Sequence, residues 1–395
     1  MSAHVRGGVG GRVAYYRSIM RPKMSQRDLA DAAHLALGTI RKIEQGERGV
    51  GDSALEAIAD ALGVDPFLLL FGRGAPHTAV HAALSALSAA LATQEIPEDG
   101  PVRPLPELRA DVDATVDWRL TAHYTRIART LPGLLAELAR ARHQFDGPDR
   151  AALAALLVTA CRSADAAAFK VGAWDLSARL IDLMRSVAPD ADDPLLTASV
   201  AYVRTETFFA ASAHTAGLRA LEQALDAAPA PATAERAAAR GALHMRAAVI
   251  AGRAGDTAAT HMHFTEARVL ADQIPEAVYH GTAFGPDSVR VHEVSVAVSL
   301  GHDHVGRALE VAREWKPPVG LPAERRSGFY IDLARAYLWS GQADRSFEAL
   351  KTARRIAPQH TRDHPWVRED AGTLRRLKRA DSEALTAFAE WCSAL

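Results

Sequence analysis

Residues 24–48, MSQRDLADAAHLALGTIRKIEQGER, decide the fold at the start of this chain. The stretch contains two short apolar patterns with helical spacing, separated by a tight turn. Leu29 and Ala33 fall on one face of the first helix, and Ile40 and Ile43 fall on one face of the second. The pattern predicts two amphipathic helices that share a small core.

The ends of both helices carry recognisable signals. Ser25 can cap the first helix, and Asp28 three residues later can reach back to complete a capping box. His34 lies at the turn, where the chain needs a left-handed residue, and histidine is one of the few non-glycine types enriched in that conformation. Gly46 ends the second helix, predicted from about Ala36.

These residues resemble the lambda-repressor-like helix-turn-helix family, also called the XRE family. The matching residues are S-Q-x-x-L-A at 25–30, T-I at 39–40, I-E-x-G-x-R at 43–48 and A-L-G-V at 61–64. The resemblance implies a five-helix DNA-binding domain over residues 12–71, whose fifth, short helix starts at Asp65-Pro66. Ala36 departs from the family, which usually has Ser or Thr there as a helix cap.

The same resemblance assigns DNA contacts. Gln26 lies near a phosphate, and Glu44 is a structural anchor inside the domain rather than a base reader. The residues on the groove-facing side of the second helix are Leu37, Gly38, Thr39, Arg41 and Lys42. Arg and Lys suit guanine or phosphate; the alternative for Arg41 and Lys42 is a solvated surface charge.

The charge distribution agrees with a phosphate-binding face. The chain has 395 residues and a net charge of -1, but residues 12–48 hold eight Lys or Arg against four Asp or Glu. A basic half that coincides with the two helices is what a nucleic-acid interface requires. The absence of a signal peptide, of long apolar runs and of a disulfide framework predicts a cytoplasmic protein without membrane spans.

Residues 72–106 form the predicted junction, with a helix from about Thr78 to Thr93 and a loop that contains four prolines. Helical patterns follow over 107–131 and 132–145. We therefore expect a second domain over residues 107–395.

From about residue 150 the chain repeats a helix, a short break and a second helix. The clearest unit, Ser327 to Pro358, resembles a tetratricopeptide repeat, and Trp366 onward would cap the array. The repeat frame places breaks at Gly172, Ser212, Gly255, Gly301 and Gly341. Such helix pairs bury their apolar faces only by stacking, so the expected fold is all-α, with a tetratricopeptide-like α-solenoid after the N-terminal domain.

The concave face of the array is the candidate effector site. The tetratricopeptide frame points inward Arg162, Tyr202, Glu206, Phe209, Arg253, Arg335 and Trp339. Aromatic groups with a few charges suit a small or peptide-like ligand; packing between repeats is the alternative. Peptide sensors of this architecture grip the peptide backbone with asparagine, and this chain has none.

Catalytic interpretations find no support. His292-Glu293 begins an HExxH-like run, but Val296 stands at the second histidine position. The pairs His77 with His81 and His360 with His364 lack a third metal ligand. We expect no enzyme activity, no cofactor and no metal.

The sequence thus predicts a transcriptional regulator that binds double-stranded operator DNA as a homodimer. Its repeat domain would mediate dimerisation and sense a small-molecule or peptide effector. The alternative is a tetratricopeptide scaffold for a partner protein, with an accessory DNA-binding domain.

Overall fold

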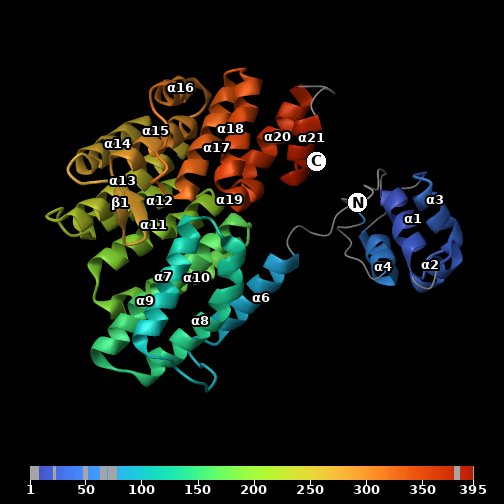
Figure 1. The fold of residues 1–395 in the computed structure, drawn as a ribbon, viewed down its shortest axis with the longest axis horizontal. Coiled ribbons are helices and arrows are strands. Elements are labelled where there is room, and N and C mark those ends of the chain that lie inside the picture. The colour runs from blue at the N-terminus through green and yellow to red at the C-terminus, as the bar shows by residue number, and fades with distance from the viewer. Residues whose placement is uncertain are drawn as a thin grey trace. The chain divides into compact units, whose positions relative to one another are not determined.

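The computed structural model describes residues 9–20, 24–47, 52–62, 69, 78–377 and 383–394. The chain divides into two compact units, Met1–Ala82 and Ala83–Leu395. Both units are helical (Figure 1), which confirms the all-α prediction.

The smaller unit contains α1 (Val9–Ile19), α2 (Gln26–Ala32), α3 (Leu37–Glu44) and α4 (Asp52–Leu62). Its core consists of the apolar faces that the periodicity predicts, with Leu29, Ile40 and Ile58 fully buried. Gly10 allows α1 to lie directly on α3, because a Cβ there would meet the Ile43 carbonyl oxygen at 1.8 Å. The predicted fifth helix falls outside the described residues, apart from Leu69, which is buried.

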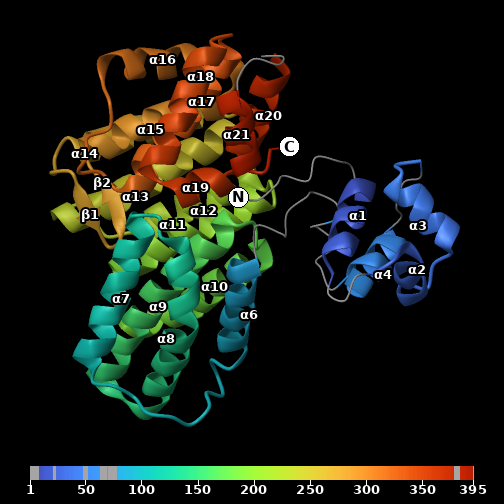
Figure 2. The same cartoon turned by 45° about the vertical axis from the view of Figure 1, so that its right-hand side comes forward.

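The larger unit consists mainly of helix pairs (Figures 1 and 2). After α6 (Thr78–Ala92) these are α7 (Leu105–Leu120) with α8 (Tyr124–Gln144), α9 (Gly147–Lys170) with α10 (Trp174–Val187), α11 (Pro194–Ala210) with α12 (His214–Ala227), α13 (Ala234–Arg253) with α14 (Thr257–Ala271), α15 (Pro286–Ser299) with α16 (Val305–Glu314), α17 (Ala323–Trp339) with α18 (Ala343–Ile356), and α20 (Pro365–Leu377) with α21 (Glu383–Trp391). The short α19 (Pro358–Asp363) and the 3-10 turns η1 (Ala188–Ala191) and η2 (His302–His304) connect elements. Each pair packs on the next, as a solenoid requires.

The predicted breaks are confirmed by the backbone. Gly172, Ser212, Gly255, Gly301 and Gly341 all have positive φ and all lie between the two helices of a pair. Glycine adopts this conformation at no steric cost, so residue type accounts for the four glycine breaks, whereas Ser212 takes a φ of 53° without that advantage.

One predicted boundary is wrong. The break in the first pair falls at Ala122, with φ of 61°, and Pro132 lies inside α8 rather than at its start. Alanine gives no sequence signal for a left-handed residue, whereas proline is a common helix breaker, so the pattern favoured the wrong position.

The array closes on itself. The Thr125 amide at the start of α8 donates a hydrogen bond to Gln359 Oε1 in α19, at 3.0 Å, and α7 contacts α17. The first and sixth pairs therefore meet, although more than two hundred residues separate them. The concave face that the repeats predict is consequently bordered by both the first and the sixth pair.

A two-stranded hairpin, which the sequence did not predict, interrupts the helices. Strands β1 (Ala277–Tyr279) and β2 (Thr282–Phe284) pair antiparallel, with Tyr279 opposite Thr282. The two residues between them, His280 and Gly281, both have positive φ, as a type I′ turn requires. Phe284 is fully buried against α13, where Gly241 makes room for its ring.

The close contact between Gly241 and Phe284 should make the stability of the larger unit sensitive to substitution at Gly241. A Cβ on Gly241 would lie 1.9 Å from Phe284 Cζ, so Gly241→Ala is expected to destabilise the larger unit by about 1–3 kcal/mol through overpacking. Gly306→Ala in α16 is the matched control, because a Cβ there meets nothing within 4 Å; it should stabilise by about 0.5–1 kcal/mol. Urea unfolding followed by tryptophan fluorescence reports on this unit alone, since all six tryptophans lie in it. Equal midpoints for the two variants would contradict the prediction.

Candidate nucleic-acid interface and ligand cavity

The turn between α2 and α3 has the predicted geometry. Ser25 Oγ accepts from the Asp28 amide at 3.1 Å, and Asp28 Oδ2 accepts from the Ser25 amide at 2.7 Å, so the capping box is present. His34 is left-handed with φ of 53°, and Gly46 follows α3 with φ of 74°. Ala36 caps α3 without a side-chain hydrogen bond, as its side chain dictates.

Helix α3 has one buried and one exposed face. Ile40 and Ile43 are buried, whereas Gly38, Arg41 and Lys42 are exposed. Leu37 and Thr39 are half-buried, and Leu37 packs against the core of the smaller unit. The exposed face therefore presents two cationic side chains and a glycine that allows close approach of another surface.

Glu44 forms the anchor that the sequence predicts. It accepts hydrogen bonds from Arg17 Nε at 2.7 Å and Arg17 Nη2 at 2.8 Å, and from Gln26 Nε2 at 2.7 Å. Burial raises the pKa of Glu44, but the hydrogen bonds from Arg17 and Gln26 outweigh it and lower the pKa below its ordinary value of 4.5. This network ties α1 and α2 to the end of α3, and it fixes the position of Gln26.

Because the pKa of Glu44 is lowered, we expect the stability of the smaller unit to fall in acid. Because the folded pKa lies below 4.5, the ion pair contributes its full stability above the unfolded pKa and loses it as pH falls through the folded pKa. Protection of α3 amides against hydrogen exchange, corrected for intrinsic rates, should fall as pH drops below about 4.5. Glu44→Gln should flatten this part of the pH profile, and an unchanged profile in that variant would contradict the assignment.

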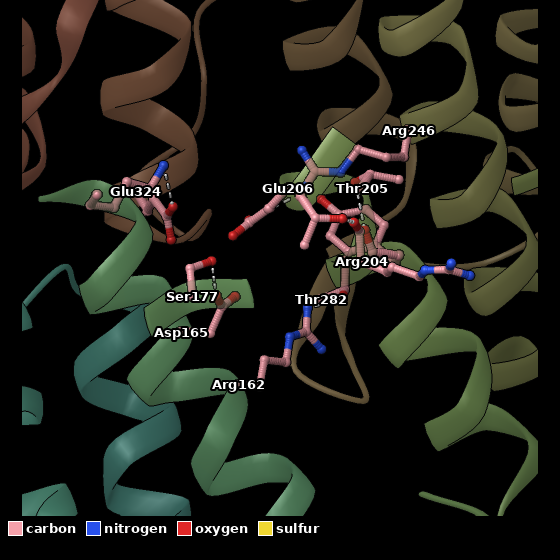
Figure 3. Close-up of polar contacts among 12 residues, drawn as sticks. Arg162, Asp165, Ser177, Arg204, Thr205, Glu206, Arg246, Thr282 and Glu324 are labelled. Carbon is pink, nitrogen blue, oxygen red and sulfur yellow. Dashed lines mark hydrogen bonds and ion pairs between the residues drawn. The ribbon is translucent and has the colours of Figure 1, made fainter. Parts of the chain in front are cut away.

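The larger unit contains a cavity of about 280 Å³. Six cationic side chains from α7, α9, α13 and α17 line it: Arg119, Arg162, Lys170, Arg246, Arg253 and Arg325. Four carboxyl groups face them, on Asp165, Glu206, Glu324 and Asp332. Figure 3 shows the Glu206 side chain extending from beside Arg246 toward Asp165, Ser177 and Glu324.

Two arginines hold the hairpin turn against the cavity. Arg119 Nη2 donates to the Gly281 carbonyl at 2.7 Å, and Arg162 Nη1 donates to the His280 carbonyl at 2.7 Å and to Ser199 Oγ at 2.6 Å. Burial, together with the neighbouring Arg119, lowers the pKa of Arg162 to about 9. Both arginines also line a second cavity of about 360 Å³.

Tyr202 lies among several guanidinium groups. Arg246 stacks on its ring at 4.3 Å, and Arg325 Nη2 donates to its hydroxyl at 3.1 Å. Burial raises the pKa of Tyr202, but Arg246, Arg325 and Arg162 outweigh it and lower the pKa to about 8. Arg325 Nη1 also donates to His292 Nε2 at 2.8 Å, and burial and Arg325 hold the pKa of His292 well below its usual range.

Lys170 neutralises one carboxylate of the cavity. Its Nζ lies 3.0 Å from Glu324 Oε1 and 3.1 Å from His360 Nε2. Burial raises the pKa of Glu324, but Lys170 and His360 outweigh it and lower the pKa to about 2. Asp165 behaves in the opposite way, because burial and the nearby Glu206 raise its pKa well above the usual range.

The structure brings together five of the seven candidate effector residues. Arg162, Tyr202, Glu206, Phe209 and Arg253 all line the 280 Å³ cavity.

The other two candidates, Arg335 and Trp339, are not among its lining residues. Arg335 pairs with Asp370 at 2.9 Å and Glu369 at 2.6 Å, and Trp339 offers its carbonyl to His302.

Sequence reasoning missed Arg119, Arg246 and Arg325. Arg246 lies seven residues before Arg253 in α13 and so shares its helical face, a signal that was available. Arg119 and Arg325 come from the first and sixth pairs, which meet only because the array closes. No local pattern predicts that contact.

Within the described residues, one helix, α9, is long and apolar enough to cross a membrane by composition. Most of it is buried among its neighbours, and it carries Arg162 and Asp165 into the cavity. It is therefore a core helix of the larger unit.

Residues 21–69 match the family model described as helix-turn-helix. No curated protein matches the chain. Among solved structures, the chain is similar to Bacillus thuringiensis PlcR, solved in complex with the peptide PapR7 and DNA, at 11% identity and a TM-score of 0.31; the match covers 69% of this chain and 95% of that one.

Proposed function

Residues 21–69 form a helix-turn-helix domain of the XRE type, and from this premise we propose that the chain is a cytoplasmic, sequence-specific DNA-binding transcriptional regulator. The observation that carries the proposal is the matched domain itself, with a recognition helix whose outer face is free of apolar packing. Gly38, Arg41 and Lys42 on that face are exposed. In this role Gln26, Leu37 and Thr39 complete the DNA contacts, with Gln26 nearest the backbone.

The larger unit mediates dimerisation and senses a small-molecule or peptide effector. The cavity supports the sensor role, because five of the residues expected on the concave face line it. A ligand changes DNA binding only if it binds one arrangement of the dimer better than the other. The alternative function, a scaffold for a partner protein, would use an outer surface of the array and would leave the cavity without a role.

If the protein is a homodimer, the spacing of its two DNA half-sites can be predicted. One helix-turn-helix reads a single half-site, so a homodimer should select an inverted repeat with half-sites about 34–36 Å apart. Selection of full-length protein on randomised duplex DNA, followed by footprinting and light scattering, tests this. A monomer at micromolar concentration that protects one half-site would contradict the dimer, and failure to enrich any sequence would contradict the regulator.

A further inference from the structure

The charges that line the 280 Å³ cavity do not balance. Of its six cations, only Lys170 and Arg246 form an ion pair with a carboxylate among the described residues, and the Arg246–Glu206 pair is long at 3.5 Å. Burial and Glu206 raise the pKa of Asp165 well above its usual range, and the fourth carboxyl group, Asp332, interacts electrostatically with Arg253. Six cationic side chains face four carboxyl groups, so the lining carries an excess of positive charge.

The remaining guanidinium groups interact with neutral partners. Arg119 and Arg162 donate to carbonyl and hydroxyl groups of the hairpin and α11, and Arg325 donates to His292 and Tyr202. Arg253 lies over the Phe209 ring at 4.4 Å and the Trp366 ring at 5.5 Å, and no hydrogen bond of its guanidinium is found within the described part of the chain. Arg119 and Arg162 are buried, Arg325 is half-buried and Arg253 is exposed. Buried cations without a counter-charge are costly, and an anion in the cavity would offset that cost for Arg119 and Arg162.

A second observation points to a ligand. Arg119 lines the cavity and is only 7% exposed, yet its Nε has no hydrogen-bond partner among the described residues. Arg246 Nε and the acceptor Glu206 Oε2, which also belong to the lining, have no partner in this part of the chain either. Buried polar groups are normally satisfied, so three unsatisfied groups around one cavity favour a polar ligand there.

We propose that this cavity binds a small organic or inorganic polyanion, a phosphate ester or a polycarboxylate, between Arg119, Arg246, Arg253 and Arg325. A volume of about 280 Å³ lies near the lower end of the usual range for ligand sites and favours a compact metabolite over an extended peptide. At least two negative charges on the ligand would match the excess of cations. That this anion is the effector rests on the proposed regulatory function. Its binding to the cavity can be measured without DNA.

Arg253→Met is the sharpest test, because methionine keeps an apolar side chain beside Phe209 and Trp366 and removes the guanidinium with its charge. Arg253 is exposed and forms no ion pair in the described structure, so the ligand-free variant should be close to the wild type in stability. Arg354→Met is the matched control: Arg354 also stacks on an aromatic ring, that of Trp391 at 4.3 Å, but it does not line the cavity.

Calorimetry on the full chain at constant ionic strength, with inorganic pyrophosphate and with citrate as probes, measures the binding. We expect one or both probes to bind wild type and Arg354→Met alike, and Arg253→Met to bind about tenfold or more weakly. Binding of pyrophosphate alone assigns phosphate chemistry, and binding of citrate alone assigns polycarboxylate chemistry.

Two results would overturn the proposal: no binding of either probe at millimolar concentration, or equal affinity in Arg253→Met and wild type. The effect of a bound probe on operator affinity is a separate measurement. A bound probe that leaves operator affinity unchanged would count against the sensor role in the proposed function and would leave the anion site standing.

Discussion

Replacing Arg41 and Lys42 together by alanine is expected to weaken operator binding strongly while the protein stays folded. Both side chains are exposed on α3 and are absent from the core of the smaller unit. Removing a side chain that bonds to a base should cost about 1–3 kcal/mol for each base concerned, which is roughly 5- to 150-fold in affinity. Gel shifts at fixed salt on the selected operator measure the change.

The control for this pair is Arg219→Ala with Arg236→Ala, which removes the same charge from exposed positions of the larger unit. The control should bind the operator as the wild type does. If the Arg41 and Lys42 variant also retains wild-type affinity, α3 is not the recognition helix, and the assignment of Gly38 and Thr39 to the same interface fails with it.

The second large effect is expected from replacing Glu44, which ties α1 and α2 to the end of α3. Glu44→Ala removes the acceptor of Arg17 and Gln26, whose hydrogen bonds to it are 2.7–2.8 Å long, from a side chain only 6% exposed. Removing one partner of a largely buried ion pair leaves the other charge uncompensated, so the smaller unit should be destabilised by about 3 kcal/mol. Amides of α3 should then exchange roughly a hundredfold faster.

Asp31→Ala in α2 is the matched control for Glu44→Ala, since it removes an exposed carboxylate from the same unit. Its α3 amides should exchange at close to the wild-type rate. Comparable acceleration in both variants would mean that general charge, and not the Arg17–Glu44–Gln26 network, governs the stability of the recognition helix.

Local patterns in the sequence were enough to predict the smaller unit and the repeat frame. The capping box at Ser25, the left-handed His34 and the glycine breaks at Gly172 and Gly341 are conformations that particular residue types favour, so they can be read one position at a time. The break at Ala122 could not be found because alanine has no preference for positive φ.

The cavity could be predicted only in part. Register along a helix placed Arg162, Tyr202 and Arg253 on inward faces, because that inference needs only the helical period. Closure of the array brings Arg119 and Arg325 to the same cavity, and this depends on the summed curvature of several helix pairs. The hairpin at residues 277–284 carried a short-range signal in His280-Gly281, but two strands of three residues each are too brief for a period to show.

The central claim is that the chain reads a DNA sequence through α3, and the ratio of specific to non-specific affinity tests it most directly. Full-length protein should be titrated, at one salt concentration, against the selected operator and against a scrambled duplex of equal length and composition. We predict a preference of about 10³-fold or more for the operator, reduced sharply when Arg41 and Lys42 are both alanine. Equal affinity of the wild-type protein for the two duplexes would contradict it.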